Sequence, residues 1–251
     1  MEEEVQSMRS TYRIRPLPIL KIEVDMGNLT YRMNYGKKIW VGIYSWYIEG
    51  GEKHILVDTA VEASFMRDSR GFPTKEVMSF EDSLGGLGLK PRDIDVVIQT
   101  HLHYDHCGNT LKCKNAKVVV QEDELKFALS PHPMMANLYI RQFFRNLRFV
   151  AIKGYCEIFP GIELIPAPGH TPGIQAVSVN TAQGKAIISG FCSIKENFEP
   201  PEEVREMWPV LTPGTHTNAM DAFDSALRIK GLADILIPHH DSAFVQVKSI
   251  P

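Results

Sequence analysis

Short apolar runs separated by turn signals predict β-strands in the first half of the chain. Residues 38–47 are rich in aromatic and β-branched side chains, residues 49–53 form a turn signal, and residues 54–57 resume the extended pattern. This succession predicts a β-hairpin. Two further runs, 95–99 and 117–121, are typical of short buried strands.

Helical patterns lie between and after these strands. Residues 79–82 have the form of a capping box, and the helix that they open is expected to end at the glycines 85–86. Residues 122–129 predict a second helix. Apolar residues recur at a helical period over 134–149 and predict a third.

The second half of the chain repeats the mixture of strands and helices. Strands are predicted at 161–165, 175–180 and 185–189, and a last one at 234–237. A helix is predicted over 218–231, with the glycine at its end as C-cap. Strand pairs with helices between them in both halves indicate α and β layers packed together.

Composition indicates a folded enzyme-sized domain. Hydrophobic residues make up 44% of the 251 residues and charged residues 23%, which is a globular profile. No linker-like stretch or repeat divides the chain, so a single domain over residues 1–251 is predicted. No apolar run approaches the roughly 18 residues that cross a bilayer, so no membrane partner is expected.

Charge and cysteine content narrow the function and the compartment. The 27 Lys and Arg against 30 Asp and Glu give a net charge of −3, which argues against a partner bound through nucleic-acid phosphates. Residues 1–6 are acidic and lack the pattern of a secretory signal. Four scattered cysteines do not make a disulfide framework. A cytoplasmic location is therefore expected.

A cluster of histidines follows the predicted strand at 95–99. His101, His103, Asp105 and His106 lie within six residues, directly after the strand. A strand end fixes where such a loop begins, so the loop can turn several side chains toward one point. Imidazole nitrogen and carboxylate oxygen are ligands of zinc and related metals. The cluster therefore predicts a metal site.

Two later histidines also follow strands. His170 lies in a loop of prolines and glycines, APGHTPG, whose backbone is restrained. His240 follows the strand predicted at 234–237. Each alone is typical of an ordinary loop, but with the first cluster they are candidates for the distant ligands of a catalytic metal site.

Together these motifs resemble the metallo-β-lactamase superfamily. The carriers of the resemblance are THLHYDHCGN, APGHTPG, the late HHD, and LVDT at residues 56–59, over about residues 20–247. The resemblance implies an α/β fold, the αβ/βα four-layer sandwich, in which two mixed β-sheets are flanked by helices and metals lie at one edge between the sheets.

The same resemblance implies two ligand sets, carried over residue by residue. His101, His103 and His170 match the ligands of a first metal. Asp105, His106 and His240 match those of a second. His240 is chosen over His239 because it stands directly before an aspartate. Asp58 is expected to accept a ring N–H from one of the ligand histidines. The implied cofactors are two divalent ions, zinc first, with iron or manganese as alternatives.

One position departs from the family pattern. Phe191 is placed in the register of the aspartate that normally bridges the two metals, and it cannot bind metal. Cys192 follows directly and is a candidate thiolate ligand, while a buried inert thiol is the equal alternative. Without a bridge the second metal would bind weakly or not at all.

Among members of the superfamily the chain is similar to the N-acyl-homoserine lactonase-like hydrolases. This resemblance implies a metallo-hydrolase that opens a lactone or similar cyclic or ester carbonyl substrate with metal-bound hydroxide. Asp105 would orient the hydroxide and pass a proton to the leaving alkoxide. These lactonases hold the carbonyl with a tyrosine shortly after the bridging position, and residues 192–194 contain none.

Other functions stay open on the sequence. The same site could hydrolyse a thioester or a cyclic amide. A mononuclear iron oxidoreductase, such as a sulfur dioxygenase, is a second alternative, and a non-catalytic protein with a decayed site is a third. The expected partner is a small-molecule substrate, and a homodimer is left open. Five residues could form an apolar lid or pack into the core: Met134, Met135, Tyr139, Phe143 and Phe144.

Overall fold

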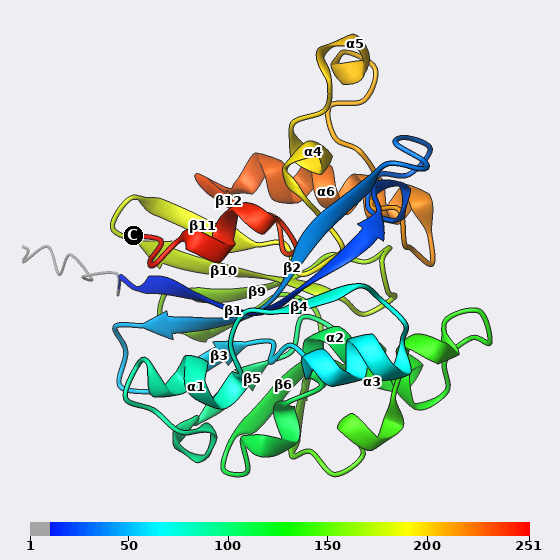
Figure 1. Cartoon of the computed structure of the whole chain (residues 1–251). Helices are drawn as coiled ribbons and strands as arrows, with labels where there is room; N and C mark the ends of the chain where they lie inside the picture. The colour runs from blue at the N-terminus through cyan, green and yellow to red at the C-terminus, as the bar shows by residue number, and fades with distance from the viewer. Residues whose placement is uncertain (1–10) are drawn as a thin grey trace, which may run out of the picture.

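Two β-sheets lie face to face in the computed structural model, which describes residues 11–251 (Figure 1). The acidic start, residues 1–6, lies outside the described residues. Helices α1, α2 and α3 cover one side of the pair, and α4 and α6 cover the other (Figure 1). The predicted four-layer α/β sandwich is therefore confirmed.

The larger sheet has seven strands and mixed pairing. Strand β2 pairs antiparallel with β1 and with β3, and β4 pairs antiparallel with β1. From β3 onward, the neighbours β3, β5, β6 and β7 pair in parallel. The strands, in sheet order, are β4 (Thr74–Glu76), β1 (Arg13–Asp25), β2 (Lys38–Glu49), β3 (Ile55–Val57), β5 (Val96–Ile98), β6 (Lys117–Gln121) and β7 (Phe149–Ile152).

The smaller sheet has five strands. Its pairs are antiparallel except for β11 and β12, which run parallel. In sheet order the strands are β12 (Ile235–Ile237), β11 (Gly184–Ile188), β10 (Gln175–Thr181), β9 (Ile162–Pro166) and β8 (Cys156–Phe159).

The helices are short, apart from α6. Ser79 caps the first by accepting a hydrogen bond from the Asp82 N–H, and Asn218 caps the last in the same way from Met220 and Asp221. Their bounds are α1 (Phe80–Gly85), α2 (Tyr104–Cys107), α3 (Glu122–Leu129), α4 (Lys195–Phe198), α5 (Glu202–Arg205) and α6 (Ala219–Leu232).

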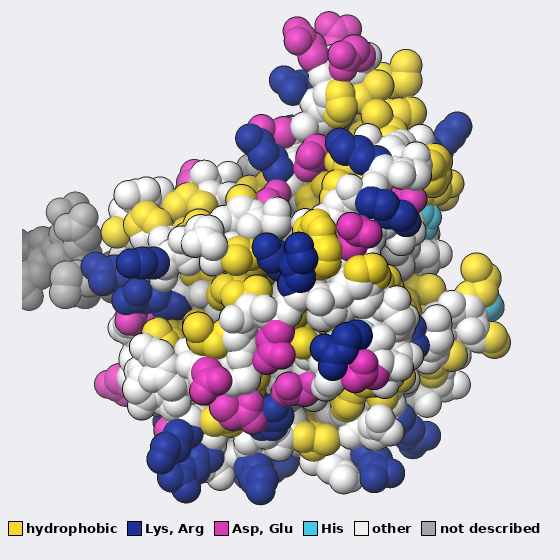
Figure 2. Space-filling view, in the orientation of Figure 1, with side chains coloured by type: hydrophobic (Ala, Val, Ile, Leu, Met, Phe, Trp, Pro, Cys, Tyr) yellow, Lys and Arg dark blue, Asp and Glu magenta, His cyan; other side chains and the backbone are white. Residues whose placement is uncertain are grey.

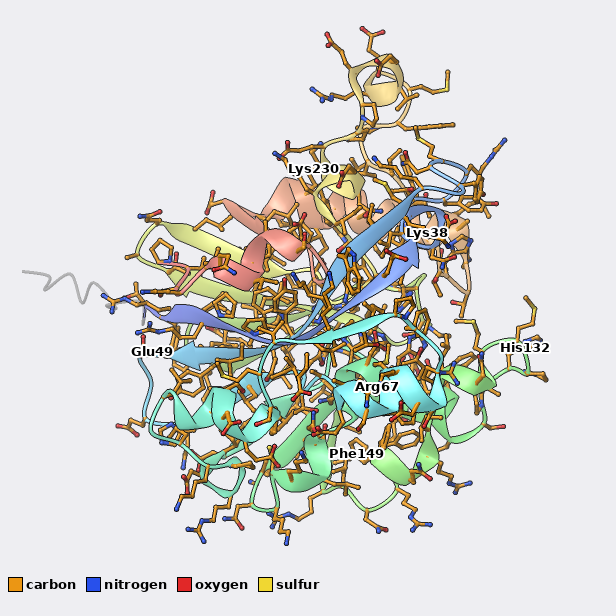
Figure 3. All side chains as sticks on the ribbon, in the orientation of Figure 1. Lys38, Glu49, Arg67, His132, Phe149 and Lys230 are labelled. Carbon is orange, nitrogen blue, oxygen red and sulfur yellow. The ribbon has the colours of Figure 1, made fainter. Side chains whose placement is uncertain are left out.

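The central core lies between the two sheets, where side chains from both faces fill the space (Figure 3). Trp46 and Ile98 of the larger sheet belong to the same buried cluster as Leu164 and Val177 of the smaller one. Alternate residues of each strand point into this layer, which is the packing expected of a β-sandwich. On the outer face of the smaller sheet, Ile229 of α6 packs on strand residues.

Two sequence-based expectations for the elements were wrong. Residues 134–149 do not form one helix: they form two short 3-10 turns, Ala136–Leu138 and Arg141–Phe143, before β7 begins. Gly231 is not the C-cap of α6, which continues to Leu232 and ends on Ala233. The long first strand, β1, was not predicted.

The surface carries both signs of charge. On the face shown in Figure 2, Lys and Arg side chains are interspersed with Asp and Glu, and acidic side chains gather around the projecting α5. Within residues 11–251, none of the helices has both the length and the apolar character needed to cross a membrane.

Candidate metal centre

Buried imidazoles from three separate loops meet at one edge of the sandwich. The first loop follows β5, the second follows β9 and the third follows β12. His132, by contrast, lies at the periphery of the molecule (Figure 3). Six of the nine histidines are buried at this edge: His101, His103, His106, His170, His239 and His240.

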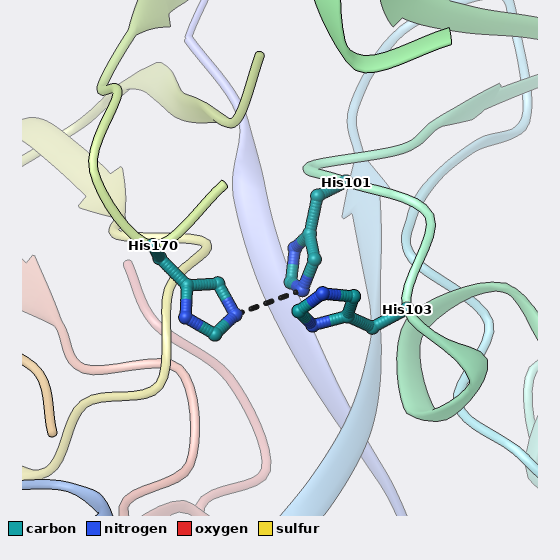
Figure 4. Close-up of side chains that lie close together, drawn as sticks. All are labelled: His101, His103 and His170. Carbon is teal, nitrogen blue, oxygen red and sulfur yellow. Dashed lines mark hydrogen bonds between the residues drawn. The ribbon is translucent and has the colours of Figure 1, made fainter. Parts of the chain in front are cut away.

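His101, His103 and His170 form a first donor group (Figure 4). One nitrogen of each lies within 4.8 Å of the others, and the Nε2 atoms of His101 and His170 are 3.2 Å apart. Burial lowers the pKa of all three side chains, to about 4 for His170, and the neighbouring imidazoles lower those of His101 and His103 further. The group is therefore held neutral, which is the form that binds metal.

Asp105, His106 and His240 form a second group next to the first. Oδ2 of Asp105 lies 3.6 Å from Nε2 of His106 and 3.9 Å from Nε2 of His240. Burial lowers the pKa of His240 to about 4. Burial also opposes a charge on His106, but Asp105 and Asp58 outweigh it and raise the pKa of that imidazole.

Backbone carbonyls fix which nitrogen of two histidines faces the centre. Nδ1 of His170 donates to the Thr215 carbonyl at 2.6 Å, and Nδ1 of His240 donates to the Gly42 carbonyl at 2.9 Å. Each Nε2 is then left without a proton and can act as a ligand. Nε2 of His103 is buried and has no hydrogen-bond partner among the described residues.

Asp58 supports the second group from behind. The buried carboxylate accepts a hydrogen bond from Nδ1 of His106 at 2.7 Å, and from the backbone N–H and hydroxyl of Thr100 at 2.8 and 2.7 Å. Burial raises the pKa of Asp58, and His106 and Thr100 oppose that rise. This contact leaves Nε2 of His106 free to face Asp105.

Glu124 of α3 joins the two histidine loops. Its carboxylate is fully buried and accepts hydrogen bonds from the Leu102 N–H at 2.9 Å, the Tyr139 hydroxyl at 3.1 Å and the Thr171 hydroxyl at 2.5 Å. Leu102 separates His101 from His103, and Thr171 follows His170. The loop approaches α3 so closely at Gly173 that a Cβ there would lie 1.9 Å from the Glu124 nitrogen, so only glycine fits.

A cavity of about 310 Å³ opens onto both groups. Strands β1 and β2 supply an apolar wall that includes Ile22 and Ile43, and the segment between β3 and β4 supplies Met66, Arg70 and Phe72. The cavity reaches His103, Asp105, His106, His170 and His240. An apolar pocket with a few polar groups at one end is the usual form of a small-molecule site.

The comparison with known families agrees with this geometry. The family model of the metallo-beta-lactamase superfamily matches residues 39–240, which include both donor groups. The chain belongs to this superfamily.

Similar proteins within the superfamily are lactonases. An N-acyl homoserine lactonase of Bacillus thuringiensis is 28% identical over 196 residues, 73% of this chain and 77% of the relative. The solved structure of an N-acyl homoserine lactone hydrolase with the product N-hexanoyl-L-homoserine at its catalytic metal centre has a TM-score of 0.75 at 25% identity. That match covers 93% of this chain and 95% of the other. A quorum-quenching N-acyl homoserine lactone lactonase has a TM-score of 0.77 at 26% identity, with 94% and 95% covered.

His239 is set aside as a ligand in favour of His240 on the sequence, yet it lies among the buried donors of the site. It is buried, its Nε2 lies 3.4 Å from Oδ2 of Asp58, and with Asp58 and His106 it forms a third group of donors. Both oxygens of Asp58 already accept hydrogen bonds, one of them from His106. The group of Asp105, His106 and His240 therefore remains the better candidate for a second ion.

Cys192 lies beside the donor groups but belongs to none of the three found in residues 11–251. Its sulfur is 3.5 Å from Nδ1 of His170 and 3.4 Å from the Thr215 carbonyl, on the side of the ring away from Nε2. Burial raises the pKa of this thiol to about 12. Phe191 packs against Phe198, with ring centroids 5.8 Å apart, and points into an apolar cluster.

None of the five residues considered for an apolar lid lines the cavity, although their neighbours Asn137 and Leu138 do. Tyr139 and Phe144 are buried in a separate core cluster, Met135 and Phe143 pack against that cluster, and Met134 is 82% exposed. Sequence reasoning missed Glu124 because a single glutamate in a predicted helix is typical of a solvated surface. Its burial depends on contacts with two distant loops.

Proposed function

We propose that this chain is a metal-dependent hydrolase that opens the ring of a lactone. The observation that carries the proposal is the pair of neighbouring donor groups at the floor of an apolar cavity, in a chain whose relatives are named lactonases. These relatives favour lactone hydrolysis over the thioester, cyclic amide and iron-oxidoreductase alternatives.

The residues present fit two divalent ions, with zinc first among the candidates. The imidazoles of His101, His103, His170 and His240 are buried and held neutral. Two Nε2 atoms approach to 3.2 Å, and Nε2 of His103 has no partner among the described residues. His101, His103 and His170 would hold one ion, and Asp105, His106 and His240 the other. Bound ions would supply a water that ionises near neutral pH and an electrophile for the carbonyl oxygen.

The chain itself would orient the substrate and move one proton. Asp105 is the most open of the proposed ligands, with its side chain 20% exposed toward the cavity. Its Oδ2 is the atom that we propose takes a proton from the attacking water and passes it to the leaving alkoxide. The apolar wall from β1 and β2 would exclude bulk water and pack against the non-reacting part of the substrate.

All proposed ligands come from one chain. The site therefore needs no second copy, and homodimer formation stays a prediction. The cysteines are unpaired, and three of the four are buried, which supports the proposed reducing, cytoplasmic location.

A substrate panel tests the proposal. Protein reconstituted with zinc is incubated with N-acyl homoserine lactones, simple γ- and δ-lactones, thioesters and cyclic amides, and products are analysed by mass spectrometry. The expected result is addition of one water to at least one lactone, lost with chelator and restored with zinc. Hydrolysis confined to thioesters or amides, or none at all, would contradict the proposal.

A further inference from the structure

The cavity beside the donor groups contains one cation that the proposed hydrolysis does not use. Arg70 is the only Lys or Arg among the described residues that line it. It follows the π-helical turn Phe65–Ser69, and its backbone N–H closes that turn on the Phe65 carbonyl at 3.2 Å. The fold therefore carries this side chain to the cavity.

The guanidinium of Arg70 lies over an aromatic ring. Its central carbon is 4.6 Å from the centroid of Tyr104. Tyr104 stands between His103 and Asp105 in the chain, and both of these residues line the same cavity as Arg70.

Hydrogen-bonding capacity on this cation is unused. Nε of Arg70 is buried and has no hydrogen-bond partner within residues 11–251. The nearby acids on the same segment have other partners: Asp68 pairs with Arg67, and Glu62 pairs with Lys112. A buried donor without a partner is unfavourable, so this N–H has a free position for water or for a ligand in the cavity.

We propose that Arg70 is a specificity-determining residue that binds a carboxylate of the substrate. A guanidinium presents paired N–H groups in one plane, and a carboxylate accepts them with two oxygens. This inference rests on the proposed lactone hydrolysis and gives its substrate class: lactones that carry a carboxylate. The apolar wall would contact the carbon skeleton of such a lactone.

Matched substrates measure the preference. One is a γ-lactone with a carboxylate on the ring, 5-oxotetrahydrofuran-2-carboxylate, and the other is its primary amide. The wild-type protein is expected to favour the carboxylate in kcat/KM by about 10- to 100-fold, the value of charge-assisted hydrogen bonds. In Arg70→Gln this ratio is expected to fall close to one, mainly through KM. Arg70→Lys, which keeps the charge but not the planar fork, is expected to lie between.

A neighbouring arginine provides the matched control. Arg67 belongs to the same turn (Figure 3), is exposed and pairs with Asp68. It does not line the cavity. Arg67→Gln is expected to keep the wild-type ratio. Equal ratios in wild type and Arg70→Gln would overturn the inference, as would a wild-type preference for the amide, which would indicate a neutral carbonyl as the partner of Arg70.

A binding measurement separates this inference from the proposed function. Tetrahydrofuran-2-carboxylate and its amide lack the lactone carbonyl and cannot be hydrolysed, so their Kd values can be measured by calorimetry on zinc-loaded protein. If no lactone is opened, the proposed function fails, but the ratio of Kd values still tests Arg70. A carboxylate preference lost in Arg70→Gln supports the inference. The same preference in both proteins would mean that metal ions alone bind the carboxylate, and the inference would fail.

Discussion

Replacing Glu124 by glutamine tests whether this residue positions the metal-binding histidines or only stabilises the fold. The carboxylate receives three hydrogen bonds, from Leu102, Tyr139 and Thr171, and the first and last of these residues adjoin ligand histidines. An amide of the same size has one acceptor oxygen. Oε1 can still accept from Leu102 and Tyr139, while the new NH2 group faces Thr171, whose hydroxyl must turn to accept.

The expected loss follows from these contacts. Each bond to a charged acceptor contributes roughly 1.5–3 kcal/mol, against roughly 0.5–1.5 kcal/mol for a neutral one. Three weakened bonds, partly offset because a neutral amide is easier to bury, lower the free energy of unfolding by about 1–3 kcal/mol. Displacement of the two histidine loops should lower zinc affinity about 10- to 100-fold, as for other groups that orient ligands.

Two assays on the same samples distinguish a role in zinc binding from a role in stability. Zinc affinity is measured by competition with a chromophoric chelator, and stability of the metal-free protein by urea unfolding. Glu122→Gln is the control, because Glu122 lies on the same helix but pairs with Lys126 at the surface. Loss of stability with wild-type zinc affinity in Glu124→Gln would refute the positioning role and leave Glu124 as a residue of the fold alone.

Three further predictions concern the donor groups. The double variant His101→Ala, His103→Ala should lose bound metal, measured by elemental analysis, and full metal content would refute the first group. Cys192→Ser should keep the metal content of wild type, because the Cys192 sulfur contacts Nδ1 of His170 rather than Nε2. Cys156→Ser is the control and should also keep it. Loss of about one ion in Cys192→Ser alone would instead support a ligand role for Cys192. Burial lowers the pKa of His170 and His240 from 6.5 to about 4. The unfolded chain therefore binds more protons than the folded one in this window, so their contribution to stability is complete above pH 6.5 and is lost as pH falls toward 4. Urea unfolding of the metal-free protein should show this decrease, and the raised pKa of His106 opposes it; constant stability across the window would contradict the prediction.

The elements that the sequence predicts well are those whose signal is local. Ser79 and Asn218 cap helices α1 and α6 with their own side chains, and the histidine motifs stand where short apolar strands end. Local chemistry also predicts the first cluster of donors, because three imidazoles and a carboxylate within six residues after a strand are typical of a metal site.

The elements that the sequence misses depend on distant contacts. Pro16 and Pro18 are atypical of a strand, and the strand β1 is therefore not evident from the sequence. In the structure both prolines pair with β2 on one side only, because β4 joins the other edge of β1 at residues 20–22. The helix expected over 134–149 is interrupted at Tyr139, whose extended backbone (φ −101°, ψ 93°) carries its hydroxyl to Glu124. A tertiary hydrogen bond there overrides the apolar periodicity.

Titration of metal-free protein with zinc tests the central claim most directly. Activity is followed as ring opening of a lactone, with the hydroxy acid identified by mass spectrometry, while zinc is added in steps. The account predicts that activity is absent without metal, rises with added zinc and stops rising once both donor groups are filled, with about two zinc ions bound per chain. Ring opening at full rate in the metal-free protein, or a zinc-saturated protein that opens no lactone, would contradict it.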